Sequence, residues 1–416
     1  MPPTEFTPAT QTELARFVAE NAAGAKQRLC PAGGRTALRF GFAGRCDVLV
    51  DTRELKRVVD YPARDMTITV EAGLPVAELQ QLLATENQQL PIDVPQAGRA
   101  TIGGAIACNV SGPRRFGYGT FRDYVIGISA VDAQGRLFQG GGRVVKNVAG
   151  YDVCKLLVGS RGTLAAITQV TLKLKPRPQT SGWWWLTFDT FPEMENVLQR
   201  LLTSAARPTA LEMLDVPAAK LVVTESRLPL PAALPVLAIQ VDGTDQEVAW
   251  QLDELRKEVV PFGVQQLERL AGEEAEKLTT ALTEFPIPTD EPLTFQANVR
   301  PSRCWEFAEL ATKCDVAVQC HAGNGVIIGQ FPEQVATLEQ ARGLLDQLRH
   351  LARRDRGNLI VLHCDPEWQA ALPMCGDPEP AWPLMVQLKR QLDPDGLWNP
   401  DRFIDRTAVA YTASIT

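Results

Sequence analysis

Two glycine-rich stretches in the N-terminal part of the chain have the composition needed to hold an anion or a flat ring. The first covers residues 31–37 (PAGGRTA) and follows a predicted short strand at residues 28–31. Adjacent glycines let backbone N–H groups converge on an anion because no Cβ stands in the way, and Thr36 adds a hydroxyl donor. A plain turn is the alternative for this stretch alone. It is neither a Walker loop nor a Gly-x-Gly-x-x-Gly pattern that opens a helix.

The second stretch, residues 100–112 (ATIGGAIACNVSG), consists mostly of small residues on which a ring or a pyrophosphate could lie. Asn109 and Ser111 could donate side-chain hydrogen bonds there. A packed helix of small residues is the alternative. A third motif, at residues 150–168, has Gly159 and Gly162 on either side of a turn that leads into a predicted strand.

The elements that must position these loops follow from hydrophobic periodicity. Helical spacing is present at residues 10–22 and 75–84, and the period of two that is typical of strands is present at residues 66–71 and 164–174. A buried strand is predicted at 47–51, and a hairpin at 124–139. Further along, predicted strands (183–188 and 235–241) alternate with predicted helices (246–259 and 334–354), and a last helix is predicted at 383–392. These elements predict an α+β chain.

Two prolines in Lys175-Pro176-Arg177-Pro178 interrupt both helix and strand, so this is the best predicted domain boundary. We expect a first domain at residues 1–178, an α+β cap domain at 179–382, and a C-terminal helix and tail at 383–416 that returns toward the first domain. A length of 416 residues agrees with more than one domain.

Composition excludes several classes of function. The net charge of -7 disfavours nucleic acid, and no run of about 18 apolar residues predicts a membrane-spanning helix. The N-terminus lacks the pattern of a signal peptide, so we expect a cytoplasmic protein. The nine cysteines are scattered without a Cys-x-x-Cys pair, which favours reduced thiols and argues against an iron–sulfur cluster on this chain.

Taken together, the order and spacing of the three glycine motifs resemble the PCMH-type FAD-binding domain of the vanillyl-alcohol oxidase and para-cresol methylhydroxylase superfamily. The resemblance covers residues 6–178 and implies two α+β subdomains with FAD stretched between them. It implies FAD contacts at Gly33, Gly34, Arg35, Thr36, Ala37, Thr101, Gly103, Gly104, Asn109, Ser111, Gly112, Gly162, Thr163 and Ile167. The first loop has no histidine, so we expect the FAD to be non-covalent.

Two further stretches, residues 142–152 (GRVVKNVAGYD) and 392–403 (LDPDGLWNPDRF), are similar to the glycolate oxidase branch of this superfamily. Within that branch the chain most resembles the shorter FAD-binding E subunit. The resemblance implies two partners: a larger FAD-linked oxidase subunit and an iron–sulfur subunit. The substrate that it implies is a small 2-hydroxy acid. We expect no direct membrane insertion, and any membrane association to come through the partners.

The sequence identifies fewer candidates for catalysis than for FAD binding. Oxidation of a 2-hydroxy acid needs a base for the hydroxyl proton and a cation for the carboxylate. Catalytic members of the branch carry a His-x-His stretch followed by Gly-Asp-Gly-Asn, whereas residues 319–325 here read QCHAGNG. Only His321 remains, so we expect no metal site. His321 is a candidate base or a structural residue that orients a loop. Arg300 is a candidate for carboxylate binding or an ordinary surface residue.

The remaining aromatic and histidine residues allow only general predictions. Trp183, Trp184 and Trp185 either lie on an edge strand that faces a partner or pack within their own domain. We expect His363 in the core and His350 in solvent. The sequence therefore predicts an FAD-binding subunit of a glycolate oxidase or dehydrogenase complex. A self-sufficient FAD-dependent 2-hydroxy-acid dehydrogenase and a non-catalytic scaffold subunit remain as alternatives.

Overall fold

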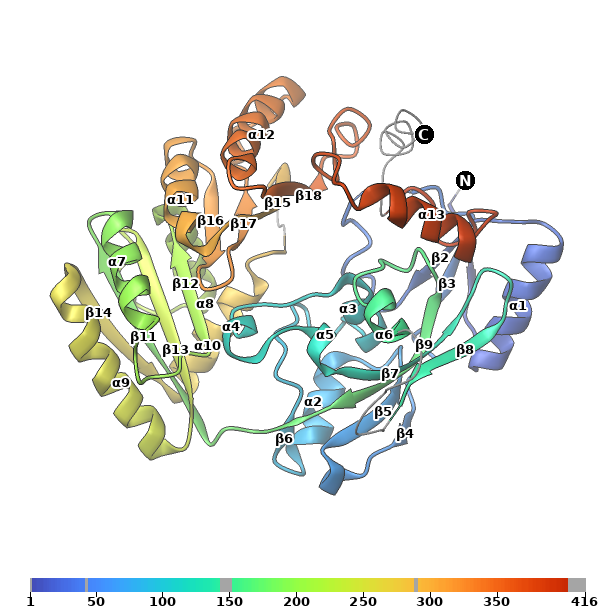
Figure 1. Ribbon diagram of the computed structural model, residues 1–416, viewed down its shortest axis with the longest axis horizontal. Coiled ribbons are helices and arrows are strands. Elements are labelled where there is room, and N and C mark those ends of the chain that lie inside the picture. Colours follow the sequence, from blue (N-terminus) through green and yellow to red (C-terminus); the bar gives the residue numbers. More distant parts are fainter. Residues whose placement is uncertain (1, 42–43, 143–151, 288–290, 403–416) are drawn as a thin grey trace. The chain divides into compact units, whose positions relative to one another are not determined.

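The computed structural model describes residues 2–41, 44–142, 152–287 and 291–402, which form two compact α+β units (Figure 1). The first unit contains the described residues of 1–110, 120–177 and 378–402, and the second contains those of 111–119 and 178–377. The second unit thus includes a short excursion from within the glycine-rich region. The predicted α+β class is confirmed.

The first unit contains a three-stranded sheet in the order β1-β3-β2, a five-stranded sheet in the order β4-β5-β9-β7-β8, and a two-stranded pair of β6 and β10. Neighbouring strands run parallel in the first of these sheets and antiparallel in the other two. The strands are β1 (Thr4–Phe6), β2 (Leu29–Ala32), β3 (Val48–Asp51), β4 (Val58–Asp60), β5 (Thr67–Glu71), β6 (Gln88–Gln89), β7 (Val125–Val131), β8 (Leu137–Gly141), β9 (Ala166–Lys173) and β10 (Lys175–Pro176). The helices are α1 (Gln11–Ala23), α2 (Val76–Ala84), α3 (Ile102–Cys108), α5 (Phe121–Tyr124), α6 (Val153–Leu157) and α13 (Trp382–Leu392).

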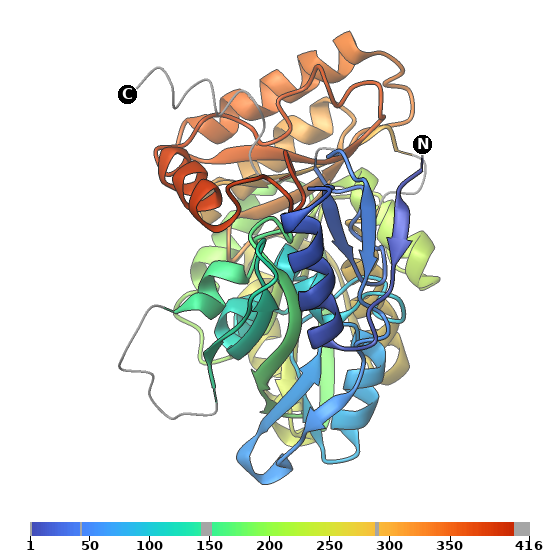
Figure 2. The same ribbon diagram turned by 90° about the vertical axis from the view of Figure 1, so that its right-hand side faces the viewer.

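Helix α1 has the apolar face that its hydrophobic spacing predicts and packs with it against residues of the three-stranded sheet and of β7 (Figure 2). Its buried side chains, Leu14 and Val18, belong to the same cluster as Val48 and Val50 of β3. Trp398, from the segment after α13, is fully buried in this cluster, and its backbone forms an isolated parallel β-bridge with Leu29 of β2. The C-terminal segment is therefore part of the core of the first unit.

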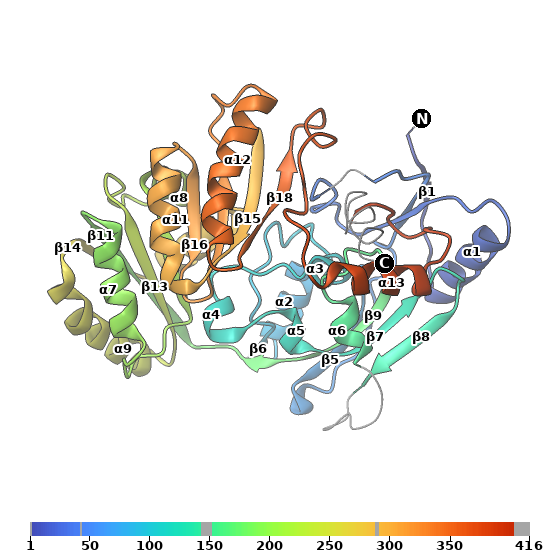
Figure 3. The same cartoon turned by 45° about the horizontal axis from the view of Figure 1, so that its top comes forward.

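The second unit is built on an eight-stranded sheet in the order β14-β11-β13-β12-β16-β17-β15-β18, with antiparallel neighbours throughout. The strands are β11 (Thr180–Phe188), β12 (Ala210–Leu214), β13 (Val236–Gly243), β14 (Val264–Ala271), β15 (Leu293–Asn298), β16 (Ala317–His321), β17 (Val326–Gln330) and β18 (Asn358–Cys364). The helices are α4 (Arg115–Tyr118), α7 (Phe191–Leu201), α8 (Val216–Ser226), α9 (Asp245–Val259), α10 (Gly272–Glu284), α11 (Cys304–Lys313) and α12 (Leu338–Arg353). Helices α11 and α12 lie side by side along this sheet (Figure 3).

The three tryptophans of β11 show how both faces of this sheet are covered. Trp183 donates from Nε1 to Thr279 of α10 at 3.0 Å, whereas Trp184 donates to the carbonyl of Leu252 in α9 at 2.8 Å. Because adjacent strand residues point to opposite faces, α9 and α10 cover opposite faces. All three indoles are buried, and β11 lies between β13 and β14. The alternative of an edge strand facing a partner was therefore wrong.

Candidate functional site

The glycine motifs that are far apart in the sequence meet in the first unit. A Cβ on Gly33 would lie 1.9 Å from Thr101 Oγ1, and one on Gly34 would lie 1.7 Å from the carbonyl oxygen of Arg99. Both glycines are therefore needed so that the first loop can approach the start of the second motif. The third motif joins through the Arg161 N–H, which donates to the carbonyl of Ala107 at 2.7 Å.

The second motif folds into α3, so its small residues do form a packed helix. Thr101 is the N-cap and accepts from the Gly104 N–H at 3.4 Å. A Cβ on Gly103 would lie 2.6 Å from that of Ala72, which explains why this helix has no larger residue there. The helix ends at Asn109, whose φ of 49° is left-handed. The cap turns the chain so that the Asn109 side chain belongs to the meeting point of the motifs.

Buried polar atoms without a partner make this meeting point a candidate binding site. Asn109 Oδ1, Ser160 Oγ and Arg402 Nε are all buried and make no hydrogen bond to any residue that the structure describes. Asn109 and Ser160 are close in space, because a Cβ on Gly159 would lie 3.5 Å from the Asn109 Cβ. Such atoms are costly when unpaired, so their number at one place indicates a polar ligand. An acceptor, a hydroxyl and a cation together fit the phosphate and ribose groups of a dinucleotide such as FAD.

The C-terminal segment supplies one side of this site. Asn399 donates from Nδ2 to the carbonyl of Arg161 at 2.9 Å, and Arg402 donates from Nη2 to the carbonyl of Leu38 at 2.9 Å. Burial lowers the pKa of Arg402, partly offset by the nearby thiols of Cys30 and Cys108. A guanidinium with a buried, unpaired N–H beside the first loop is suited to an anion.

The same segment is fastened to the third motif by Lys389 of α13. Its Nζ donates to the carbonyl oxygens of Thr163 at 2.6 Å and Trp398 at 2.8 Å, and it also forms an ion pair with Asp393. The Asp393 carboxylate in turn accepts from the backbone N–H groups of Leu397 and Trp398, both at 2.8 Å. These bonds explain how an irregular segment holds Arg402 in place.

Several of the residues that the resemblance implied for FAD have partners within the protein. Arg35 donates from Nη2 to Glu5 at 2.6 Å and to Asp51 at 3.0 Å, although its Nε is buried and has no partner within residues 2–41, 44–142, 152–287 and 291–402. The Thr163 hydroxyl donates to the carbonyl of Ser160 at 2.7 Å, and Ile167 of β9 is a core residue. Thr36, Ala37 and Gly162 lie in the loops of the first unit, whereas Ser111 and Gly112 belong to the second unit.

A separate polar cluster is buried in the second unit. Glu212 of β12 is fully buried and pairs in register with His321 at the end of β16. The His321 ring nitrogen Nδ1 lies 2.8 and 2.9 Å from the two Glu212 carboxylate oxygens. Gln319 donates from Nε2 to Glu212 at 2.7 Å, while its own Oε1 is buried without a partner among the described residues. A carboxylate that accepts from Nδ1–H leaves Nε2 as the nitrogen able to take a proton.

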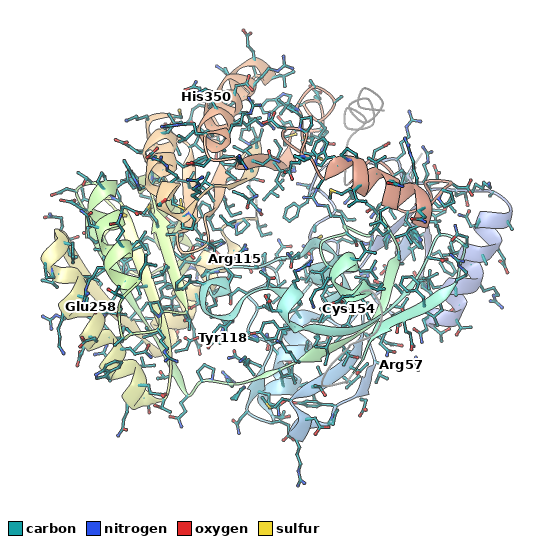
Figure 4. The ribbon with its side chains drawn as sticks, in the orientation of Figure 1. Arg57, Arg115, Tyr118, Cys154, Glu258 and His350 are labelled. Atoms are coloured by element: carbon teal, nitrogen blue, oxygen red, sulfur yellow. The ribbon has the colours of Figure 1, made fainter. Side chains whose placement is uncertain are left out.

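The same cluster includes a cation, Arg115 of α4, labelled in Figure 4. Its Nη1 donates to Ser111 Oγ at 3.0 Å, and its Nε is buried without a partner in the described part of the chain. Burial lowers the pKa of Arg115, and the nearby charge of Glu212 partly offsets this effect.

The remaining predicted polar residues lie elsewhere in the second unit. Arg300 is exposed and forms an ion pair with Asp355 at 3.3 Å, as a surface residue does. His350 is exposed on α12, and His363 is half-buried on β18 next to the fully buried Cys364. Within the described residues, no group of three or more His, Cys, Asp or Glu side chains could hold a metal ion. The helices of that part of the chain include none long and apolar enough to cross a bilayer.

Four residues of these sites were missed by the sequence prediction. Ser160 lies in the third glycine motif and Arg402 in the stretch at residues 392–403, but nothing in their spacing showed that their polar atoms would be unpaired. Glu212 had a usable signal, since a single acidic residue stands inside the apolar stretch ALEML. Arg115 had none, because its companions come from strands roughly 100 and 200 residues further along the chain.

Comparison with known proteins identifies both units at the domain level. Residues 2–141 match the FAD binding domain family, and residues 177–293 match the C-terminal domain of FAD linked oxidases. The fold is similar to that of alkyldihydroxyacetonephosphate synthase, with a TM-score of 0.68 at 18% identity over 95% of this chain and 75% of that one. At this identity the likeness concerns the fold alone.

Individual relatives are similar over part of their length. The chain is 28% identical to glycolate oxidase subunit GlcD of Bacillus subtilis over 71% of this chain and 63% of that protein. It is 39% identical to glycolate oxidase subunit GlcE of Escherichia coli over 32% and 38% of the two chains. It is 35% identical to the mitochondrial D-lactate dehydrogenase [cytochrome] of Arabidopsis thaliana over 46% and 33%. The matched regions thus span less than two thirds of each of these relatives.

Proposed function

We propose that this chain, which carries an FAD-binding domain and the C-terminal domain of FAD-linked oxidases, is an FAD-dependent oxidoreductase that oxidises a 2-hydroxy acid. FAD is its cofactor, as the matched domains indicate. The observation that carries the proposal is the meeting of three glycine motifs around the unpaired polar atoms of Asn109, Ser160 and Arg402.

The residues that would hold FAD are those of the first unit. We assign to FAD binding the residues that the resemblance implied in this unit: Gly33, Gly34, Arg35, Thr36, Ala37, Thr101, Gly103, Gly104, Asn109, Gly162, Thr163 and Ile167. Ser160 and Arg402 join this set. Ser111 and Gly112 remain candidates from the resemblance only. When bound, FAD supplies a flavin ring that accepts a hydride at N5. Burial raises the pKa of Cys108, which disfavours the thiolate needed for a covalent flavin link and supports non-covalent binding.

The substrate class is supported by the names of relatives and by the second unit. The relatives include proteins named for glycolate, D-lactate and D-2-hydroxyglutarate, which all have a hydroxyl on the carbon beside a carboxylate. His321 is our candidate for the base: Nδ1–H donates to Glu212, so Nε2 can take the hydroxyl proton. Arg300, exposed and paired with Asp355, is a weaker candidate for carboxylate binding.

We further propose that the chain works as a subunit of a glycolate oxidase-type complex. The similarity to both GlcD and GlcE supports a multi-subunit assembly, and the short match to GlcE has the higher identity of the two. A larger FAD-linked oxidase subunit and an iron–sulfur subunit are the proposed partners. The self-sufficient dehydrogenase and the non-catalytic scaffold are the competing functions.

The test is purification of the chain followed by a visible spectrum and anaerobic addition of glycolate, D-lactate or D-2-hydroxyglutarate. We expect a yellow protein that releases its flavin on acid precipitation and is bleached by one of these acids. A colourless protein that does not take up added FAD would overturn the proposal. A yellow protein that none of the acids reduces, even with its partners present, would favour the scaffold.

A further inference from the structure

We propose that Arg115 is a carboxylate-binding residue, whose guanidinium receives the carboxylate of the 2-hydroxy acid while His321 faces its hydroxyl. The inference deepens the proposed function and rests on it. It assigns a substrate contact to a residue in the short excursion of the chain (111–119) that belongs to the second unit.

The excursion is held firmly on the eight-stranded sheet. The Gly117 N–H donates to the carbonyl of Thr209 at 3.0 Å, just before β12, and the Tyr118 hydroxyl donates to Asp242 of β13 at 3.0 Å (Figure 4). Helix α4 thus lies against the same strand that carries Glu212. These anchors fix the backbone on which Arg115 stands, as a binding residue requires.

The guanidinium of Arg115 has unused hydrogen-bonding capacity. Ser111 accepts one bond from it, its Nε is buried without a partner, and no carboxylate pairs with it in the part of the chain that the structure describes. Arg349, the other arginine whose burial lowers its pKa in this unit, instead donates to the carbonyls of Leu359 and Pro373. A buried guanidinium N–H without a partner is costly, so the Nε–H of Arg115 indicates an absent anion.

The negative charge of Glu212 does not fill that role. Its two oxygens already accept from His321 and Gln319, and its effect on Arg115 is electrostatic rather than a hydrogen bond. The cluster therefore offers three kinds of group to a ligand: a cation at Arg115, a proton acceptor at His321 and an unpaired carbonyl oxygen at Gln319. A carboxylate fits the planar fork of an arginine, and an adjacent hydroxyl can donate to a neutral imidazole.

The experiment measures ligand binding rather than turnover. Oxalate resembles the substrate class, because it has a carboxylate beside an oxygen-bearing carbon, but it has no C–H hydride to give. Its dissociation constant for the FAD-loaded full chain is measured by titration calorimetry for wild type, Arg115→Gln, Arg115→Lys and Arg269→Gln. Arg269 is a matched control, since it is an exposed arginine on β14 of the same unit.

We expect Arg115→Gln to weaken oxalate binding by about 10- to 100-fold, the usual effect of losing a charge-assisted contact. Arg115→Lys should bind with intermediate affinity, and Arg269→Gln should match wild type within about twofold. Flavin content should be equal in all four proteins. If Arg115→Gln does not fold, the lysine variant carries the test, and unweakened binding by it would overturn the proposal.

The outcomes separate this inference from the proposed function. Equal oxalate binding by wild type and folded Arg115→Gln overturns the inference and leaves the oxidoreductase proposal standing. Binding that depends on Arg115, in a protein whose flavin no 2-hydroxy acid reduces even with its partners present, supports the binding residue and overturns the proposed reaction. No oxalate binding by the yellow wild-type protein overturns the inference, while bleaching by a 2-hydroxy acid in that protein would still support the reaction.

Discussion

At the scale of single residues, the bond between Glu212 and His321 gives the second unit its chemical character. A fully buried carboxylate within hydrogen-bond distance of Nδ1 selects one form of the imidazole, because an ionised carboxylate can only accept. Glu212 acts through His321 and is therefore a positioning residue in our proposal. Replacement of Glu212 should first change which nitrogen of the His321 ring carries the proton.

We predict that Glu212→Gln removes the fixed Nδ1–H form of His321. The chain has three histidines, so nitrogen-labelled histidine gives three ring patterns that His350→Gln and His363→Gln would assign. In wild type the His321 pattern should show Nδ1 carrying a proton, and in Glu212→Gln this pattern should be lost or mixed. Flavin reduction should slow by roughly 10- to 100-fold, the range for an impaired general base. An unchanged ring pattern would contradict the positioning role.

The glycines of the first loop show where reasoning from sequence succeeded and where it stopped. The sequence predicts that Gly33 and Gly34 leave room for an anion, whereas the atoms that a Cβ would meet there are those of Thr101 and the Arg99 carbonyl. A Gly34→Val variant would therefore disturb the protein itself and could not report on FAD alone. Sequence identifies a tight position, whereas the atoms that make it tight come from a distant segment.

At the scale of elements, local patterns were good predictors. The helix predicted at 10–22 is α1 (Gln11–Ala23), and the strand predicted at 66–71 is β5 (Thr67–Glu71), because hydrophobic period and caps act locally. What the patterns could not give is pairing: β12 lies between β13 and β16, whose sequence positions differ by about 80 residues. The Glu212–His321 pair depends on that pairing.

Asp215, the N-cap of α8, is an element-scale feature with a consequence for stability. Its Oδ1 accepts from the backbone N–H groups of Ala218 at 2.9 Å and Val318 at 3.1 Å, so it joins the helix to β16. Burial raises the pKa of Asp215 from 3.8 to about 7 against the opposing effect of those two bonds. The folded protein therefore keeps a proton on Asp215 at a pH where the unfolded chain has lost it.

We predict that Asp215→Asn makes the stability of the protein less sensitive to a rise in pH from about 4 to about 7. Because the folded state binds the extra proton between about pH 4 and pH 7, wild-type stability should fall as pH rises through that window and then level off. Asparagine keeps the capping oxygen without the charge, so the variant should gain on the order of 2–4 kcal/mol relative to wild type between pH 4 and pH 8. Denaturant unfolding of the full chain at several pH values measures this difference.

The exposed N-cap Asp152 of α6 gives the matched control for that experiment. It also accepts a backbone bond, from Lys155 at 3.2 Å, but its side chain is exposed. Asp152→Asn should not reproduce the gain at pH 8. A difference between Asp215→Asn and wild type that stays constant from pH 4 to pH 8 would show that burial does not control this carboxyl group.

At the scale of the whole molecule, we assign FAD binding to the first unit and substrate binding to the second. The first unit holds the motifs suited to FAD, and its C-terminal segment adds Arg402 through the bonds of Lys389 and Asn399. The second unit contains the Glu212, His321 and Arg115 cluster, of which Arg115 comes from the excursion at residues 111–119. A boundary placed at 178 by proline content could not show that excursion, since nothing local marks a segment that packs elsewhere.

Electrons that reach the flavin need an acceptor, and this requirement leads to a prediction about partners. The nine cysteines lack the close spacing of an iron–sulfur motif, so the sequence offers no cluster to receive them. We predict that the chain, isolated from its native host, co-purifies with a larger flavoprotein and a cysteine-rich subunit. We also predict that alone it oxidises glycolate only slowly, because the stretch at residues 319–325 retains only His321. The measurement pairs a pull-down with glycolate-dependent dye reduction. Steady reduction by the isolated chain at about 1–10 per second, with no partner recovered, would instead establish a self-sufficient dehydrogenase.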